Sequence, residues 1–173
     1  MTVYAVEPWS DVVGEMRGLW HAHFREVASD QERAPLDPDL EAYARLEAAG
    51  ALHVLTMREG RVLAGYLVAL VWPHLHHRSV SHAFFDLYYV RPAHRRWTAG
   101  IRLFREAERT LAARGVRRMI TGTKLHSAPN GRPLDVGPIF RRLGWVEMER
   151  QYGKWILSLI HISEPTRLQL IAY

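Results

Sequence analysis

The chain has 173 residues, 48% of them hydrophobic, so it is long enough for one domain with its own core, and it has no apolar run that would span a bilayer. It contains no cysteine, which excludes disulfides, thiolate nucleophiles and cysteine-based metal sites. The formal net charge of +5 favours anionic partners such as nucleotide cofactors, nucleic acids or acidic proteins. The first residues lead directly into a mixed strand, so no signal peptide is expected and the predicted location is cytoplasmic.

The first predicted elements are a strand and a long helix. Residues 3–6 favour a strand, which a proline at position 8 closes. Ser10 or Asp11 is expected to cap a helix whose apolar positions recur at helical spacing over residues 12–27. A polar loop follows this helix.

The middle of the chain predicts a helix and three strands. The helix covers about residues 39–49 and ends at Gly50, where a left-handed cap is natural. Two runs, 52–57 and 62–71, are strand-like and are joined by a short hairpin turn. Residues 82–90 form the next strand.

The last part of the chain alternates helices and strands. An apolar stripe beginning at residue 100 predicts a helix that stops at Gly115. Residues 119–123 favour a strand, 136–143 a short helix, and 145–155 one or two final strands. The order of elements is thus β-α-α-β-β-β-α-β-α-β.

The stretch from Tyr88 to Phe104 reads as a strand, a short basic turn and the start of a helix. The first N–H groups of such a helix are unpaired, and the positive end of its dipole lies beside Arg95 and Arg96. Together these groups make a seat for a phosphate. The sequence therefore predicts a phosphorylated cofactor at this junction.

This stretch resembles the acetyl-CoA-binding motif of the GNAT superfamily of N-acetyltransferases. The matching positions are Val90, Pro92, Arg95, Gly100 and Leu103. Arg96 and Thr98 depart from the family, where glycines usually stand. The resemblance implies acetyl-CoA as co-substrate and an α/β GNAT fold, with a mixed central sheet and helices on both faces. The overall pattern is most similar to the short, divergent GNAT-like acetyltransferases common in phage and bacterial genomes.

The resemblance also implies which residues bind the cofactor. In the family, backbone N–H groups at the splayed end of the fourth strand hold the pantetheine and the thioester carbonyl, and those of the following loop cradle the pyrophosphate. Carried over to this chain, the cofactor-binding residues are Tyr89, Val90, Arg95, Arg96, Trp97, Thr98, Ala99, Gly100 and Ile101.

Acetylation of an amine needs a proton acceptor for the amine and a proton donor for the thiolate. Family members often carry a glutamate base on the fourth strand, and Phe84 stands near that place, with His82 and Asp86 on the same face by alternation. Asp86 suits a base if burial raises its pKa; alternatively it is a structural aspartate. The family's acid tyrosine falls at Phe140, which has no proton to give. Either the thiolate leaves without an acid, or Tyr152 or a histidine serves.

Four histidines, at positions 74, 76, 77 and 82, lie between the third and fourth predicted strands. In the family this hairpin lies beside the acceptor cleft, so His74 and His76 are candidate substrate-binding residues. Exposed or structural histidines are the alternative, and a metal site ranks behind both because the segment contains no carboxylate before Asp86. His23 is expected in the core or lining a groove.

The resulting hypothesis is an N-acetyltransferase that transfers acetyl to a primary amine by direct attack in a ternary complex. The acceptor is a small-molecule or protein amine, no membrane partner is expected, and a homodimer is left open. The rival hypothesis is a catalytically inactive GNAT-fold binding or virion-associated module. A basic nucleic-acid-binding domain is third, since the arginines lack interleaved aromatic residues.

Residues 157–167 read LSLIHISEPTR, which resembles the translation of a common transposon-based sequencing adapter. Residues 157–173 are therefore predicted to be a non-native tail, and residues 1–156 the acetyltransferase-like domain. The alternative is a native closing strand, which the alternation near the C-terminus permits.

Overall fold

The computed structural model describes residues 1–28, 31–95, 98–123 and 135–156. The strands of this part of the chain form one sheet in the order β1-β2-β3-β4-β5. They are β1 (Thr2–Val6), β2 (Leu52–Glu59), β3 (Val62–His74), β4 (His77–Val90) and β5 (Arg118–Ile120). The strands β1 to β4 pair antiparallel in sequence order, whereas β5 pairs parallel with β4. The sheet is therefore mixed.

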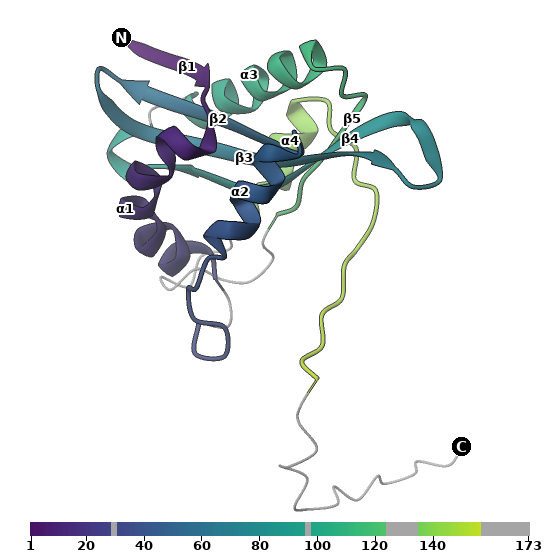
Figure 1. The fold of residues 1–173 in the computed structure, drawn as a ribbon, viewed down its shortest axis with the longest axis horizontal. Helices are drawn as coiled ribbons and strands as arrows, with labels where there is room; N and C mark the ends of the chain where they lie inside the picture. Colours follow the sequence, from purple (N-terminus) through teal and green to yellow (C-terminus); the bar gives the residue numbers. More distant parts are fainter. Residues whose placement is uncertain (29–30, 96–97, 124–134, 157–173) are drawn as a thin grey trace, which may run out of the picture.

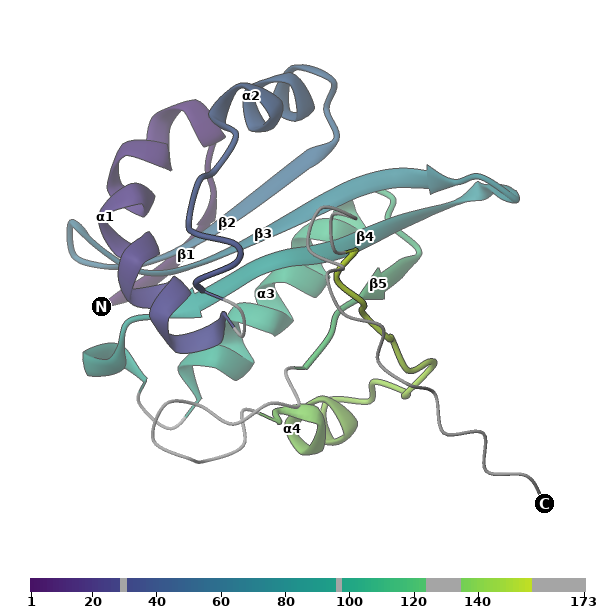
Figure 2. The same ribbon diagram turned by 90° about the horizontal axis from the view of Figure 1, so that it is seen from below.

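Helices cover both faces of this sheet (Figure 1). The two N-terminal helices, α1 (Trp9–Val27) and α2 (Leu40–Ala48), lie over one face. The other face carries α3 (Ala99–Ala113) and α4 (Gly137–Arg142), as Figure 2 shows. A 3-10 turn, η1 (Pro92–His94), follows β4. The predicted α/β architecture, a mixed sheet with helices on both faces, is confirmed.

Each face of the sheet has its own apolar core, because the strand side chains alternate between the faces. The α1 side is filled by fully or nearly fully buried residues of α1, β2 and β3, among them Val12, Met16, Trp20, Val54, Tyr66 and Val68. The α3 side is filled by the predicted stripe of α3 packed on the sheet, among them Leu103, Ala107, Leu111, Leu55, Leu67 and Phe85. The site described below lies at the edge of both cores.

The strand β4 carries one extra residue, Asp86. Its β3 neighbours Val68 and Ala69 pair with Leu87 and Phe85, so Asp86 has no partner in the ladder. A bulge of this kind bends the strand and reverses the alternation of side chains beyond it. Asp86 and Leu87, although consecutive, both face the α1 and α2 side of the sheet.

The prediction of one or two final strands over residues 145–155 is wrong. After α4 the chain turns at Gly144, whose φ of 84° is the left-handed conformation that glycine adopts readily, and Trp145–Ile156 is irregular. A strand is stabilised by pairing with a neighbour, and no described strand pairs with this segment. Apolar alternation without a partner edge does not make a strand.

The start of α1 also differs from the prediction. The helix begins at Trp9, with Pro8 as the capping position, rather than after Ser10 or Asp11. The carboxylate of Glu47, on α2, accepts hydrogen bonds from the backbone N–H groups of Trp9 and Ser10. A side chain from a neighbouring helix thus satisfies groups that a local cap would satisfy.

Candidate functional site

The strand β4 has an open edge over its second half. Its pairing with β5 covers only His82 to Phe84, where Ile120 is the last residue paired. From Phe85 to Val90 no described strand lies beside β4 on this side, and β5 runs away from it (Figure 2). The opening between the two strands leaves backbone hydrogen-bonding groups unpaired, which makes this edge a candidate ligand site.

The alternation of an antiparallel ladder identifies the free groups. The N–H of Arg91 donates to the carbonyl of Ala64 across β3, at 2.8 Å. The N–H of Val90, one residue earlier, therefore points to the open edge, as do the backbone groups of Tyr88. The C=O of Val90 accepts a hydrogen bond from Arg95 Nε. The backbone groups of Tyr89 point to β3 by the same alternation. Tyr88 is thus a backbone contributor that the sequence did not single out.

The start of α3 lies at the end of this edge and presents unpaired donors. The first helical hydrogen bond runs from the N–H of Arg102 to the carbonyl of Thr98, at 2.8 Å. The N–H groups of Ala99, Gly100 and Ile101 thus have no partner within the helix. A Cβ built on Gly100 would meet no atom within 4 Å. Such a helix start is suited to an anion such as a phosphate.

Arg95 makes contacts within the protein rather than standing free. Its Nε donates to the carbonyl of Val90 at 2.8 Å, and its guanidinium pairs with Glu26 at 2.6 Å. The guanidinium carbon lies 5.5 Å from the centre of the Tyr89 ring. Arg95 therefore ties the loop after β4 to α1, and much of its charge is balanced by Glu26. Arg96 and Trp97, also predicted to bind the cofactor, lie outside the described residues.

Tyr89 and His23 form a layer behind the cofactor edge, on the α1 side. The two rings stack at 4.8 Å between centres, and His23 Nδ1 lies 2.9 Å from the Tyr66 hydroxyl. His23 is buried, so the expectation of a core or groove-lining histidine is met. The ring of Tyr89 is buried in this layer, so any contact that it makes with a ligand is limited.

Asp86 lies at the closed end of the open edge. Its side chain is exposed, whereas the prediction of a base required a buried one. The hydroxyl of Tyr43, on α2, donates to Asp86 Oδ2 at 2.8 Å. Burial and the nearby Asp86 charge raise the pKa of Tyr43, so this hydroxyl keeps its proton. Asp86 is thus held in place by α2 and faces solvent.

His82 lies two residues from Phe84 on the same face and is only 5% exposed. Its ring is 4.8 Å from that of His74, which in turn stacks on His77 at 4.9 Å. Burial, and then the charges of His74, Arg118 and His77, lower the pKa of His82. A histidine in this state is neutral at pH 7 and is able to accept a proton.

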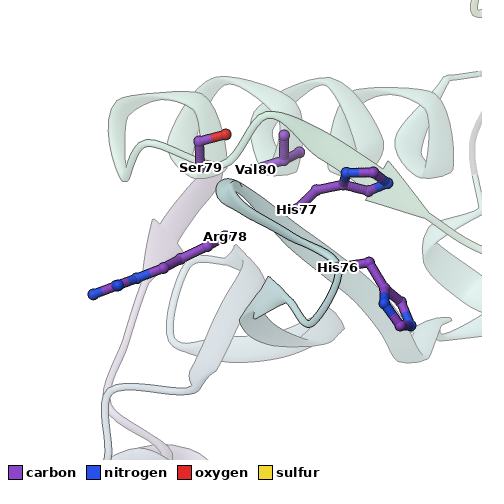
Figure 3. A pocket seen from close by; sticks show the side chains of 5 residues that line it. All are labelled: His76, His77, Arg78, Ser79 and Val80. Carbon is purple, nitrogen blue, oxygen red and sulfur yellow. The ribbon is translucent and has the colours of Figure 1, made fainter.

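His76 lies further out, at the tip of the β3–β4 hairpin. The strands run longer than predicted, to His74 and from His77, so this hairpin projects beyond the helices (Figure 2). An open hollow at the tip is lined by His76, His77, Arg78, Ser79 and Val80, whose side chains point in different directions (Figure 3). It lies at the opposite end of β4 from Val90. Within the described residues, no group of three or more histidine, aspartate or glutamate side chains gathers to hold a metal ion.

Phe140, the residue at the place of the family's acid, belongs to an aromatic cluster on the α3 side. Its ring lies 5.1 Å from Phe104, 5.5 Å from Trp145 and 6.5 Å from Tyr88. The hydroxyl of Tyr88 donates to the carbonyl of Gly122, just beyond β5, at 2.9 Å. Burial raises the pKa of Tyr88, so it too keeps its proton.

Tyr152, the other candidate acid, is 91% exposed on the irregular segment after α4. Its side chain makes no hydrogen bond or ring contact with another described residue. The structure thus does not bring it to the opening between β4 and β5. Thr121, just beyond β5, has a buried hydroxyl with no hydrogen-bond partner in the part of the chain that the structure describes.

The open edge of β4, which leads to a helix start, fits a ligand that combines an extended amide chain with phosphates. The sequence matches the model of the acetyltransferase (GNAT) family over residues 15–130, so the chain belongs to this family. Acetyl-CoA is therefore its co-substrate. The unpaired N–H groups of Val90 and Gly100 fit such a molecule.

Solved structures with the same fold agree with this assignment. An aminoglycoside acetyltransferase from an uncultured soil metagenomic sample aligns with a TM-score of 0.69 at 17% identity, over 91% of this chain and 99% of the other. The aminoglycoside acetyltransferase AAC(6')-Iy, solved with a bisubstrate analogue, aligns with a TM-score of 0.63 at 17% identity, over 91% of this chain and 99% of the other. A predicted acetyltransferase from Clostridium acetobutylicum, solved with acetyl-CoA, aligns with a TM-score of 0.57 at 11% identity, over 95% of this chain and 100% of the other. At such identities these structures establish the fold alone.

No curated protein sequence matches the chain. None of the helices in the described ranges is long and apolar enough to cross a membrane.

Proposed function

We propose that the protein is an N-acetyltransferase that transfers the acetyl group of acetyl-CoA to a primary amine by direct attack in a ternary complex. The observation that carries this proposal is the open edge of β4, which has the unpaired helix start of α3 at one end and Asp86 with His82 at the other. A thioester whose phosphates sit at α3 and whose arm follows β4 brings its acetyl group toward the bulge.

In this arrangement the chain's backbone binds the co-substrate. The N–H groups of Ala99, Gly100 and Ile101 receive the phosphates, with the positive end of the α3 dipole behind them. The N–H groups of Val90 and Tyr88 bind the amide chain and orient the thioester carbonyl. Arg95 shapes the loop between these two parts through Glu26 and Val90. Arg96, Trp97 and Thr98 complete the proposed seat on the strength of the family resemblance.

The amine loses its proton near the bulge. His82 is neutral at pH 7, and its contacts with His74 and His77 lead outward to the exposed hairpin, which gives the proton a path to solvent. Asp86 is exposed and lies four residues along β4 from His82, about 13 Å away. Its carboxylate attracts the ammonium form of the acceptor, and water carries the proton from there to His82. We assign Asp86 to binding of the amine and His82 to acceptance of its proton. His74 and His76 remain the proposed contacts with the rest of the substrate.

The fold brings no described acidic side chain to the departing thiolate. Phe140 has no proton, and the hydroxyl of Tyr152 would have to be carried in by its irregular segment. Solvent supplies this proton in the simplest form of the proposal, because the thiolate of CoA is a stable leaving group relative to an amine.

The experiment that tests the proposal measures two things on the purified protein. Calorimetry with CoA tests the binding site, and release of free thiol from acetyl-CoA in the presence of a panel of primary amines tests the transfer. Binding with turnover supports the proposal. Binding without turnover on any amine favours the rival, an inactive GNAT-fold binding or virion-associated module, and salt-dependent binding of DNA or RNA without CoA binding favours the nucleic-acid-binding alternative.

We also propose that residues 1–156 form the acetyltransferase domain and that residues 157–173, which lie outside the described residues, are a non-native tail. The support for this is the resemblance of residues 157–167 to an adapter translation. From the sequence pattern alone, we likewise propose a phage or bacterial type of acetyltransferase, a cytoplasmic location and a homodimer.

A further inference from the structure

An aromatic surface lies beside Asp86 on the α1 and α2 side of the sheet. Trp72 on β3 is 39% exposed, and its ring lies 6.4 Å from that of Phe84 on β4, at an angle of 40°. We call these two residues the aromatic platform. It lies on the part of β3 and β4 that leads into the projecting hairpin, where Trp72 is opposite His82 in the ladder.

The platform and the Asp86 carboxylate share one face. Phe84 and Asp86 are two residues apart on β4, a spacing of about 7 Å along a strand. Tyr43 donates to Oδ2 of Asp86, whereas Oδ1 has no hydrogen-bond partner among the described residues. Tyr43 is itself fixed, because its ring stacks on Trp9 at 4.3 Å. A carboxylate of fixed orientation thus offers one free oxygen next to an aromatic surface.

A carboxylate beside aromatic rings is suited to a single ammonium group with an apolar body. The ammonium pairs with Asp86, and the rings of Phe84 and Trp72 attract the cation and cover the carbon skeleton. A body about the size of one aromatic ring spans the distance from Asp86 to the platform.

The other ionisable groups around the platform oppose a second ammonium. His82 interacts electrostatically with His74, His77 and Arg118, and none of these groups carries a negative charge. Arg118 is a cation, so a polyamine would bring further positive charges toward it, and none of these four side chains pairs with a carboxylate of the described residues. The charges therefore select for a monoamine.

We propose that the acceptor of this enzyme is an arylalkyl monoamine, whose ammonium binds Asp86 and whose ring lies on Trp72 and Phe84. The inference rests on the proposed function. In the reaction the amine nitrogen forms a bond to the acetyl carbonyl carbon and the C–S bond breaks. The ammonium gives up two protons in total, of which one goes to solvent and the other ends on the thiol of CoA.

The test compares 2-phenylethylamine, ethylamine and a deoxystreptamine aminoglycoside as acceptors for the full chain, with thiol release as the readout. Burial of one ring on the platform predicts that kcat/KM for 2-phenylethylamine exceeds that for ethylamine by about 10- to 100-fold. The aminoglycoside is expected to be the poorer substrate of the two large amines.

Two variants locate the effect. Trp72→Ala is expected to reduce the ratio of kcat/KM for 2-phenylethylamine to that for ethylamine by about 5- to 10-fold, with CoA affinity unchanged. Leu75→Ala is the matched control, because Leu75 is 94% exposed on the same hairpin but outside the platform, and it should leave the ratio as in the wild type. If Trp72→Ala does not fold, Phe84→Leu replaces it, and CoA binding reports folding in each case.

The outcomes separate the two proposals. Higher efficiency with the aminoglycoside, or an unchanged ratio in a folded Trp72→Ala variant, refutes the platform while the acetyltransferase stands. Binding of CoA with no turnover of any amine refutes both.

Discussion

Placing one negative charge at the start of α3 tests the proposed phosphate-binding site most directly. Gly100 is exposed, does not require a positive φ, and has open space where a Cβ would lie. Gly100→Asp therefore fits the helix without strain, and Gly100→Asn is a control of the same shape without the charge. The two variants are compared with each other, so changes common to both cancel.

The charge has opposite effects on the helix and on the ligand. An acidic residue in the first turn stabilises a helix by about 0.3–1 kcal/mol through the dipole, so Gly100→Asp should unfold at the same temperature as Gly100→Asn or a few degrees higher. A carboxylate about 5 Å from a phosphate charge costs roughly 1 kcal/mol at a dielectric constant of water and about 3 kcal/mol at an effective value near 20. The expected loss of CoA affinity is thus about 5- to 150-fold.

Calorimetry with CoA and thermal unfolding without it measure the two effects separately. The difference in affinity should shrink as the ionic strength rises, because salt screens charges near the surface. Equal CoA affinity in the two variants, at low salt and with both folded, would show that the phosphates do not bind at the start of α3.

Three further predictions address the reaction, the fold and the chain end. His82→Gln and Asp86→Asn should each lower turnover by about 100-fold with little change in CoA affinity, and wild-type rates in both would make these residues structural. Burial lowers the pKa of His53 to about 4. Protonation therefore favours the unfolded state, where the pKa is near 6.5. The free energy of unfolding therefore falls by about 3 kcal/mol as the pH drops from 6.5 to 4. Urea unfolding of His53→Gln should not show this loss of stability. An equal pH dependence in the variant and the wild type would disprove the assignment. A chain ending at Ile156 should keep its melting temperature and CoA affinity, whereas unfolding on truncation would make residues 157–173 part of the domain.

The sequence predicted the elements whose signals are local. The apolar stripe of α3 and the glycine ends of helices depend on neighbouring residues, so their bounds were close to those observed; Gly50, for example, has a φ of 65°. The junction between β4 and α3 was predictable for the same reason. Its unpaired N–H groups follow from the helix start itself and need no tertiary contact.

Features that depend on distant residues were missed. The cap of α1 comes from Glu47, 38 residues away from Trp9, so no pattern near the helix start contains it. The final strands were predicted from alternation alone, but a strand also needs a partner edge. The spread between β4 and β5 ends the predicted strand 119–123 at Ile120, because that is where its partner is lost.

Asp86 illustrates why the candidate site was harder to predict than the fold. Its neighbours Phe84, Phe85, Leu87 and Tyr88 are apolar or aromatic, and regular alternation through such a run predicts a buried aspartate. Asp86 keeps the face that alternation from Phe84 gives it, but there it meets the Tyr43 hydroxyl and solvent rather than a core, and the bulge shifts every later side chain to the other face. The bulge is invisible in the sequence, since it is set by the register with β3.

The same bulge accounts for the relation between the two halves of the site. Pairing with β5 ends at Phe84, and the extra residue that follows bends β4 away from the course of its neighbour. The opening that exposes the backbone of Tyr88 and Val90 therefore begins at Asp86, whose side chain faces the proposed acceptor side. A co-substrate bound along the open edge and an amine bound at Asp86 therefore meet at the bulge. Deletion of Asp86 would leave Leu87, Tyr88 and Val90 paired with β3 and on their present faces, but it would remove the bend of β4 and the carboxylate together. It is therefore expected to weaken binding of both the co-substrate and the amine, whereas Asp86→Asn keeps the bulge and should affect only the amine.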